Sequence, residues 1–488
     1  MQLSGENSKP ECDIIIHKKN DVFLQVECDR SIARELNDFF SFWVPEAKYM
    51  PAYKSRMWDG KIRLFDSRVN QIYVGLSDYL REFADKRNYS IEGGDWSTIA
   101  THREDVESFV SSLQIPIQPR DYQIDAVHHA IRNGRSVLVS PTASGKSLII
   151  YILIRYFEKI FYDPKYTSIL LLVPTTSLVE QMYSDFKSYG WNSDYYCHRI
   201  YGGREKDTTK LVTISTWQSL YQMPKNFFNK FGVIMGDEAH TFKADSLKKI
   251  MHKTTECKYK YGFTGTLDGY QCHRLVLEGL FGPVKQVTTT KQLIDNKQLS
   301  DIKVHGIVLT YSKEECIIRK YHDEISYLTE HTKRNNLISN LAIDQKGNTL
   351  VLFSLIKHGE ELFKKIKEKR NGVHLVYGAT DTETRENIRA LAEENTGLII
   401  VASFGVFSTG INIRNLHNII FASPYKSRIR NLQSIGRGLR LHDSKVAAKL
   451  YDIADDFEGR NHTFRHFKER IKLYNEEGFD YKLHKVQI

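Results

Sequence analysis

The chain has 488 residues and carries 69 Lys and Arg against 59 Asp and Glu, a formal net charge of +10. Its length, 41% hydrophobic and 26% charged content predict a globular protein of about three domains. The longest apolar stretch, 397–407, is too short to span a membrane. The opening residues lack a signal-peptide core, so we expect a cytoplasmic protein with no membrane partner. Six scattered cysteines without C-x-x-C spacing favour reduced thiols over a zinc site or disulfide framework.

Residues 1–115 are predicted to form a small α/β domain. In chain order its expected segments are the strands CDIII (12–16) and VFLQVEC (22–28), a helix over 31–42, a turn at Asp59-Gly60 and a helix over 77–88. Ser31 is the expected N-cap of the first helix. Asp-Gly has the composition of a two-residue hairpin turn.

After about residue 119, apolar runs alternate with helical patterns. The expected strands are VLVS (137–140), ILLLVP (169–174), LVTIST (211–216), GVIMGDE (232–238), YGFTGT (261–266), TLVLFS (349–354), HLVYGAT (374–380), GLIIVAS (397–403), HNIIFAS (417–423) and AKLYDIAD (448–455). Runs that are apolar throughout indicate strands buried on both faces of a parallel sheet. The sequence therefore predicts two tandem doubly wound α/β lobes, over 116–290 and 291–460.

The C-terminal extension, 461–488, is predicted to contain an amphipathic helix packed on the second lobe. Its apolar residues recur at spacings of three or four, at Phe464, Phe467, Ile471 and Tyr474. Gly478 is the expected end of this helix.

A phosphate-binding loop is predicted where VLVS runs into PTASGKS (141–147) and a helix. Backbone N–H groups of such a loop and helix N-terminus point at one anion. Lys146 can reach the β- and γ-phosphates of ATP, and the Ser147 hydroxyl can ligate Mg²⁺. The remaining expected contacts are Thr142, Ala143, Ser144 and Gly145. The match to the P-loop pattern is imperfect, because Ser140 occupies the first glycine position.

Asp237 and Glu238 follow a buried strand about 90 residues after the loop. Two carboxylates at a strand end are costly to bury, which disfavours a structural role. We expect Asp237 to hold Mg²⁺ and Glu238 to orient and deprotonate the attacking water. A third element, QSIGRGLR (433–440), places Arg437 and Arg440 on one face of a helical turn, where two guanidiniums can stabilise a leaving γ-phosphate.

These three elements, in this order and spacing, resemble superfamily 2 helicases and translocases over residues 119–456. The resemblance includes RDYQ with Gln123 as the adenine reader, the strand-contacting motifs VPTTSLVEQM (173–182) and ISTWQSL (214–220), TGT (264–266), VLFSLIKHG (351–359) and VASFGVFSTGINI (401–413). It implies RecA-like lobes that share one ATP site, nucleic-acid contacts at Thr176, Thr216 and Ser354, and a nucleotide contact at Gly410. Ala143 and Asn412 depart from the usual glycine and aspartate.

Within the superfamily, the chain is similar to the recombination helicases of T4-like bacteriophages, also in its N-terminal FFSF and WDGKIRL segments. That resemblance implies ATP-driven unwinding of branched DNA in phage recombination, replication and repair, with forks, Holliday junctions and R-loops as substrates. It also implies a monomer in the host cytoplasm whose partners could include phage single-strand-binding or recombination proteins, with RNA–DNA hybrid as a further substrate.

Alternatives stay open at this point. The motor could be a duplex DNA translocase or RNA helicase serving another complex, or a nucleic-acid-binding module with an inactive ATPase. In the N-terminal domain, Lys61 and Arg63 are expected to share one face of a strand near Trp58 and to contact DNA. Trp58 could instead close a small core.

Overall fold

The computed structural model describes residues 12–94, 100–160, 168–406, 413–424 and 447–488, with the short stretches 427, 431–432, 434–436, 439 and 441. The chain forms two compact units. Unit 1 comprises the described parts of Met1–Ser140 and Gly145–Val287, and unit 2 comprises Pro141–Ser144 with the described part of Thr288–Ile488. No helix among the described residues is long and apolar enough to cross a membrane.

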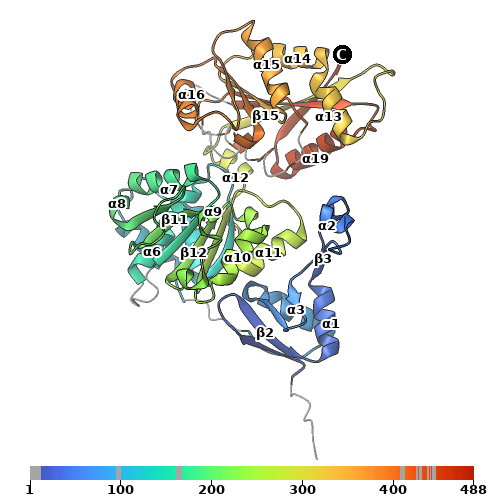
Figure 1. Ribbon diagram of the computed structural model, residues 1–488. Coiled ribbons are helices and arrows are strands. Elements are labelled where there is room, and N and C mark those ends of the chain that lie inside the picture. Colours follow the sequence, from blue (N-terminus) through green and yellow to red (C-terminus); the bar gives the residue numbers. More distant parts are fainter. Residues whose placement is uncertain are drawn as a thin grey trace, which may run out of the picture. The chain divides into compact units, whose positions relative to one another are not determined.

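The N-terminal domain of unit 1 is built on a five-stranded sheet in the order β5-β6-β2-β1-β7. Figure 1 shows β2 of this sheet beside α1 and α3. Its elements are β1 (Ile14–Lys18), β2 (Phe23–Cys28), α1 (Arg30–Phe39), β3 (Ser41–Trp43), α2 (Pro51–Lys54), β4 (Lys61–Arg63), β5 (Phe65–Asp66), β6 (Gln71–Tyr73), α3 (Ser77–Arg87) and β7 (Ile91–Gly93). β3 and β4 form a separate antiparallel pair. The two predicted strands and two predicted helices are confirmed.

Two local predictions in this domain were wrong. Helix α1 begins at Arg30 with Asp29 as its N-cap, so Ser31 lies inside the first turn. Asp59-Gly60 does not join neighbouring strands, because β4 pairs with β3 and residues 44–60 separate them. Gly60 has another role: at φ +82° it lies against the Trp43 ring, and a Cβ there would come within 2.9 Å of that ring.

The rest of unit 1 is a seven-stranded sheet in the order β10-β11-β9-β12-β13-β8-β14, in which each pairing is parallel. Its elements are α4 (Arg103–Ser112), α5 (Asp121–Asn133), β8 (Arg135–Val139), α6 (Lys146–Ile160), β9 (Ser168–Val173), α7 (Thr176–Ser188), α8 (Ser193–Tyr196), β10 (Cys197–Ile200), β11 (Val212–Thr216), α9 (Trp217–Leu220), β12 (Phe231–Asp237), α10 (Asp245–Lys253), β13 (Tyr259–Thr264), α11 (Gln271–Phe281) and β14 (Val284–Gln286).

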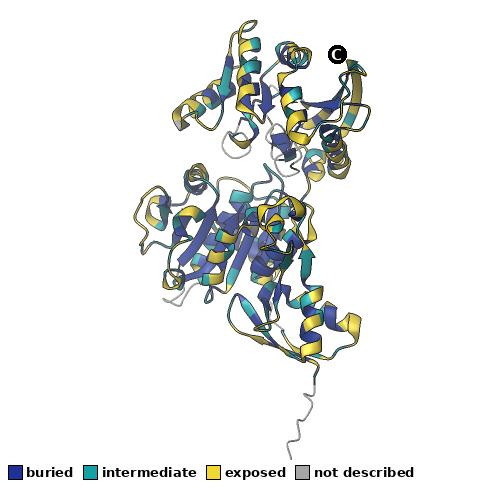
Figure 2. Cartoon of the chain, turned by 45° about the vertical axis from the view of Figure 1, so that its right-hand side comes forward, coloured by how far each residue is buried: buried dark blue, intermediate teal, exposed yellow. Residues whose placement is uncertain are grey.

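Helices cover both faces of this sheet. Strand β9 is buried at every residue, and its side chains alternate between two cores. One core includes α5, α6 and α7, and the other includes α9, α10 and α11. Figure 2 shows the strands buried and the outer helix surfaces exposed. This is the doubly wound arrangement expected for strands that are apolar throughout.

The N-terminal domain packs on the α11 side of this sheet, and the two share one apolar core. The Tyr79 hydroxyl donates to Glu278 Oε2 at 2.6 Å. Gly75 lies so close to α11 that an added Cβ would meet the Glu278 carbonyl oxygen at 1.9 Å. Such close backbone approach, at a position only glycine can occupy, fixes the domain on the first lobe.

Unit 2 contains the second seven-stranded sheet, in the order β17-β18-β16-β19-β20-β15-β21, also parallel. Its elements are α12 (Thr290–Asp295), β15 (Asp301–Thr310), α13 (Tyr321–Glu330), α14 (Thr332–Ile343), β16 (Thr349–Phe353), α15 (Ile356–Lys367), β17 (Val373–Val376), α16 (Thr382–Glu394), β18 (Ile399–Ser403), β19 (Asn418–Phe421), β20 (Ala447–Asp456), α19 (His462–Glu477) and β21 (Asp480–Gln487). The ten strands predicted for the two lobes are all found.

The C-terminal helix is confirmed, and Gly478 ends it in a left-handed conformation at φ +70°. Phe467 packs against Val308 and Ala454 of the sheet. The sequence did not predict β21, which follows the helix and pairs with β15 at the sheet edge. Most of its residues are exposed, so it lacks the apolar run that identified the central strands.

Candidate active site

The loop between β8 and α6 has the geometry of an anion cradle. Lys146 begins helix α6, and its Nζ donates to the Ser140 carbonyl oxygen at 3.2 Å. The Ser147 hydroxyl is 2.8 Å from the Tyr189 hydroxyl. Ala143 has φ +67°, the left-handed region that favours glycine. This backbone conformation explains why glycine is usual at this position in the superfamily. Alanine adopts it at a cost in conformational free energy.

Position 145 requires glycine for two reasons, its backbone conformation and the closeness of the Gln123 side chain. It has φ +81°, and a Cβ there would approach Gln123 Nε2 to 2.3 Å. Gln123 is buried and donates from Nε2 to the Gly145 carbonyl oxygen at 3.4 Å, while its Oε1 accepts from the Arg120 backbone N–H at 2.9 Å. The residue expected to read adenine is thus held against the phosphate loop.

Asp237 ends β12 and is 4% exposed. Burial, together with the Glu238 carboxylate, raises the pKa of Asp237 to about 7, and Lys146 opposes this rise. Its Oδ1 atom accepts no hydrogen bond from the described residues. A buried carboxylate oxygen without a partner, near a lysine, is suited to a cation.

His240 connects Glu238 to the TGT motif. Its Nδ1 is 3.4 Å from Glu238 Oε2 and 3.0 Å from Thr264 Oγ1. Thr264 in turn accepts from the Ser140 backbone N–H through its carbonyl oxygen at 2.8 Å. The phosphate loop, the carboxylates and the TGT segment are therefore joined within one lobe. Sequence reasoning gave His240 no role, although its place beside Glu238 in GDEAH was a signal.

These residues fit ATP and Mg²⁺. The loop has left-handed positions at Ala143 and Gly145, and the Ser147 hydroxyl and Asp237 Oδ1 are oxygen donors of the kind that Mg²⁺ prefers. The described residues contain no group of three or more His, Cys, Asp or Glu side chains that could hold a metal. A site of this kind is completed by waters and phosphates rather than by a protein cage.

The predicted nucleic-acid contacts of the first lobe differ in exposure. Thr176 begins α7 and is exposed, directly after the N-cap Thr175, whose Oγ1 accepts from the Leu178 backbone N–H at 3.3 Å. Thr216 ends β11 and is 5% exposed, with its hydroxyl 2.9 Å from that of Ser219. Thr176 is therefore available to a ligand, whereas Thr216 is positioned to orient its neighbours.

In unit 2, Ser354 is exposed at the carboxyl end of β16, and its backbone N–H donates to Ser423 Oγ at 3.1 Å. The His358 ring holds Ser423 from behind, at 3.1 Å from its hydroxyl. Burial and the nearby Arg334 guanidinium lower the pKa of His358 to about 3, so the ring is neutral near pH 7.

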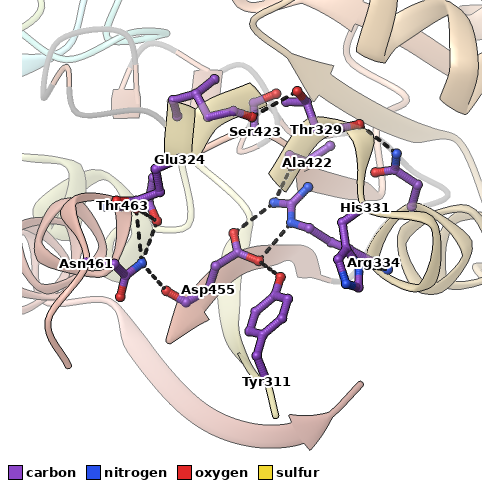
Figure 3. A network of polar contacts seen from close by, with 12 residues as sticks. Tyr311, Glu324, Thr329, His331, Arg334, Ala422, Ser423, Asp455, Asn461 and Thr463 are labelled. Atoms are coloured by element: carbon purple, nitrogen blue, oxygen red, sulfur yellow. Dashed lines mark hydrogen bonds and ion pairs between the residues drawn. The ribbon is translucent and has the colours of Figure 1, made fainter. Parts of the chain in front are cut away.

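A buried ion pair lies behind this strand end. The fully buried Arg334 donates to Asp455 Oδ1 at 2.8 Å and to the Ala422 carbonyl oxygen at 2.8 Å, while the Tyr311 hydroxyl donates to the same carboxylate at 2.7 Å (Figure 3). Hydrogen bonds of this kind hold two charges in a low-dielectric interior. They fix the carboxyl ends of β19 and β20.

Three of the predicted site residues, Arg437, Arg440 and Gly410, lie outside the described residues.

In the N-terminal domain, Lys61 lies at the tip formed by residues 41–63, with its Nζ 5.2 Å from the centroid of the Trp43 ring. Trp58 is half-buried, and its Nε1–H donates to the Lys61 carbonyl oxygen at 2.8 Å. Arg63 is exposed and pairs with Asp59, and hydrogen bonds from Arg63 lower the pKa of Asp59 to about 2. Leu64, next to Arg63, is buried, and Ile62 is half-buried.

Sequence reasoning missed Trp43, an exposed aromatic residue of this tip. It is 61% exposed and lies opposite Lys61 in the β3–β4 pair. Trp43 lies next to Lys61 because β3 pairs with β4. The two strands are far apart in the chain, so the sequence does not show this contact.

Three families match the chain. Residues 13–93 match the family described as DNA helicase UvsW, N-terminal; residues 116–269 match type III restriction enzyme, res subunit; and residues 332–442 match the helicase conserved C-terminal domain.

Among known proteins, the chain is 35% identical to the ATP-dependent DNA helicase uvsW of Enterobacteria phage T4, over 98% of this chain and 100% of that protein. The crystal structure of T4 UvsW is similar with a TM-score of 0.53 and 33% identity, covering 97% of this chain and 99% of that one. A fragment of a type I restriction enzyme HsdR subunit from Vibrio vulnificus, at 18% identity and a TM-score of 0.58, covers 84% of this chain and 83% of its own and shares the fold.

Proposed function

The chain belongs to the family of the T4 DNA helicase UvsW, and on this premise we propose that it uses ATP hydrolysis to unwind and branch-migrate forked DNA, Holliday junctions and R-loops. The observation that supports ATP hydrolysis is the Glu238–His240–Thr264 series beside the phosphate loop, with Asp237 electrostatically coupled to Glu238 and Lys146. A dead ATPase would have no need to keep Asp237 buried with a free oxygen.

Each residue of this site has a chemical role that follows from its position. Lys146 neutralises phosphate charge at the start of α6, where the helix N-terminus also favours anions. Glu238 is the general base, and His240 holds its carboxylate. When bound at Ser147 and Asp237, Mg²⁺ supplies positive charge that stabilises the phosphoryl group in transfer. We assign Arg437 and Arg440 to the same stabilisation, and Gly410 to nucleotide contact, on the motif resemblance.

We further propose that the tip of the N-terminal domain contacts DNA. Trp43 and Met57 are 61% and 85% exposed there, beside the exposed cations Lys54 and Arg56. Aromatic faces and cations together suit nucleic acid, because bases stack and phosphates attract. Lys61 and Arg63 add charge, and Trp58 braces the strand that carries Lys61.

In the two lobes we propose that Thr176 and Ser354 contact the phosphate backbone of the nucleic acid. We propose that Thr216 supports the contact made by Thr176. The domains that carry these roles are 1–115, 116–290, 291–460 and 461–488. Phage single-strand-binding or recombination proteins are the proposed partners, the protein acts as a monomer, and the host cytoplasm is the proposed location.

A substrate panel tests the proposal. ATP turnover and strand separation would be compared for a replication fork, a four-way junction, an R-loop, a blunt duplex and an RNA duplex. We expect ATP-dependent unwinding of the branched DNA substrates above the blunt duplex. Stimulation by the RNA duplex alone would replace the proposal with an RNA helicase, and turnover without strand separation would indicate a translocase.

A further inference from the structure

Among the described residues of unit 2, no helix covers the amino-terminal half of one sheet face at β20, β15 and β21. On the adjacent strands β20, β15 and β21, the aligned pairs Lys303–Lys449, His305–Tyr451 and His305–Lys482 project on the same side, because parallel partners in register share a face. The opposite side of β15 packs on α19 through Val308 and Phe467. We call the uncovered set the basic half-face; its members are Lys303, His305, Lys449, Tyr451, Lys482 and His484.

Three rings of the basic half-face form a ladder across the strands. The His305 ring stacks on Tyr451, with centroids 5.3 Å apart, and on His484, with centroids 5.4 Å apart. His305 Nδ1 and His484 Nε2 are 3.2 Å apart, so one ring donates to the other. The Tyr451 hydroxyl donates to Gln345 Oε1 at 2.8 Å. The ladder is therefore ordered without any ligand.

The three lysines are exposed. None of their side chains forms an ion pair within 4.0 Å with another described residue. Burial, His484 and these lysines all lower the pKa of His305. Two acids share this face: Asp480 is the aligned partner of Lys303, and Asp301 is the first residue of β15.

The positive charge continues beyond the half-face. The Gln345 carbonyl oxygen, next to the exposed Lys346, accepts from Arg370 Nη1 at 3.3 Å. Arg370 follows α15, whose last turn carries Lys364, Lys365 and Lys367. The end of α15 therefore adds cations, with the exposed acids Asp344 and Glu368 among them.

The basic half-face lies away from the nucleic-acid contact proposed for the same lobe. Ser354 is at the carboxyl end of β16, whereas Lys303, His305 and Lys449 are in the amino-terminal halves of their strands. In open parallel α/β sheets, ligands of the main site bind at the carboxyl ends. The half-face is therefore a separate surface.

We propose that the basic half-face binds the phosphate backbone of duplex DNA at a second site on this lobe, an inference that rests on DNA being the substrate of the proposed function. Unpaired cations on three neighbouring strands present a repeated array of donors, and the imidazole edges add N–H groups between them. Each strand of a duplex carries one phosphate per about 3.4 Å of helix axis, so several can be contacted at once. A second grip would hold one arm of a branched substrate while the motor moves along another.

Duplex DNA fits this surface better than an acidic protein. The face is built on adjacent strands, and its exposed residues are cations and polar rings rather than the apolar anchors that stabilise most protein interfaces. Phosphate binding needs only charge and hydrogen-bond donors.

The test is the salt dependence of duplex binding by the full chain without ATP. The variant is Lys303→Gln, Lys449→Gln and Lys482→Gln together, and the matched control is Lys468→Gln, Lys472→Gln and Lys485→Gln, which removes equal charge from α19 and from the opposite side of β21. Each lost phosphate contact lowers the log–log slope by about 0.9. Between about 50 and 200 mM salt, we expect wild type and control to lose about 40-fold more affinity than the variant.

ATP turnover at saturating single-stranded DNA is measured in the same preparations and should be unchanged in the variant. An unaltered salt slope in the variant, or a loss of binding to poly-glutamate without a change for duplex DNA, would overturn the proposal. A variant whose turnover collapses would also overturn it, because the lysines would then belong to the motor. If DNA does not stimulate the ATP turnover of the wild type, the proposed function fails. The comparison of salt-dependence slopes then still decides whether the half-face binds DNA.

Discussion

The nucleotide site and the tip of the N-terminal domain are built on opposite principles. At the nucleotide site, Asp237 is 4% exposed and Ala143 and Glu238 have left-handed backbones. At the tip, Trp43 and Met57 are 61% and 85% exposed. Chemistry on a phosphate needs groups that are fixed and shielded from water before the ligand arrives. The DNA contact proposed for the tip needs side chains that reach outward, and the Trp58 hydrogen bond to Lys61 holds the strand beneath them.

This comparison predicts that a conservative change in the nucleotide site has the largest effect. Glu238→Gln keeps the shape of the side chain but cannot accept a proton. Hydrolysis should fall by about 10²–10⁴, while ATP still binds. Single-turnover hydrolysis and equilibrium nucleotide binding would be measured together. Glu205→Gln, at an exposed position of the same lobe, should leave both unchanged. Lost ATP affinity with normal hydrolysis of bound ATP would assign the base elsewhere.

At the tip, the effect should appear in DNA affinity and not in folding. Trp43→Ala removes an exposed ring, and loss of base stacking costs about 1–3 kcal/mol, so affinity for forked DNA should fall about fivefold or more. The melting temperature should stay near wild type. Trp58→Ala is the matched comparison, and it should melt lower because its hydrogen bond to Lys61 is lost. Equal melting of the two variants would contradict the division of roles.

The link between the carboxylates and the TGT segment should give a smaller change. His240→Ala removes the contacts to Glu238 and Thr264. A hydrogen bond contributes about 0.5–1.5 kcal/mol, so DNA-stimulated turnover should fall up to about tenfold. We expect turnover without DNA to fall less. The contact joins the ends of β12 and β13, so its loss should mainly affect how DNA binding stimulates the carboxylates. Thr264→Val removes the other partner of the contact and should lower DNA-stimulated turnover to a similar extent. Different effects of the two variants on turnover would argue against a shared contact.

The smallest effect concerns backbone strain in the phosphate loop. Ala143 has φ +67°, where glycine is at ease, so Ala143→Gly should raise the free energy of unfolding by at most about 1 kcal/mol. The control Ala126→Gly, inside helix α5, should lower it by a similar amount. Denaturant unfolding of both variants is the measurement. A destabilised Ala143→Gly would show that the loop is not strained at this residue.

The sequence predicted most of the fold because the central strands are apolar throughout. The same property located Asp237 and Glu238 at the end of a buried run, and Lys146 was located by the loop that follows another buried run. By contrast, β15 and β21 were not predicted: β21 is mainly exposed, and β15 alternates buried residues with polar ones such as Lys303 and His305.

Contacts between distant segments were also beyond sequence reasoning. His240 was visible, but its partner Thr264 comes from another strand. Trp43 and Lys61 meet only through the pairing of β3 with β4. The basic half-face requires the order of β20, β15 and β21 in the sheet. Local patterns therefore predict chemistry at strand ends, whereas surfaces assembled across strands need the structure.

The most direct test of the division between the two regions is a crossed measurement. ATP turnover at saturating forked DNA and the Kd for that DNA would be determined for Lys146→Ala and for the double variant Trp43→Ala, Lys61→Ala. We predict that Lys146→Ala loses turnover, to less than about a tenth of wild type, and keeps its DNA affinity. The double variant should keep its turnover and lose affinity. If either variant lost both properties while remaining folded, the separation of a buried catalytic site from an exposed DNA grip would be contradicted.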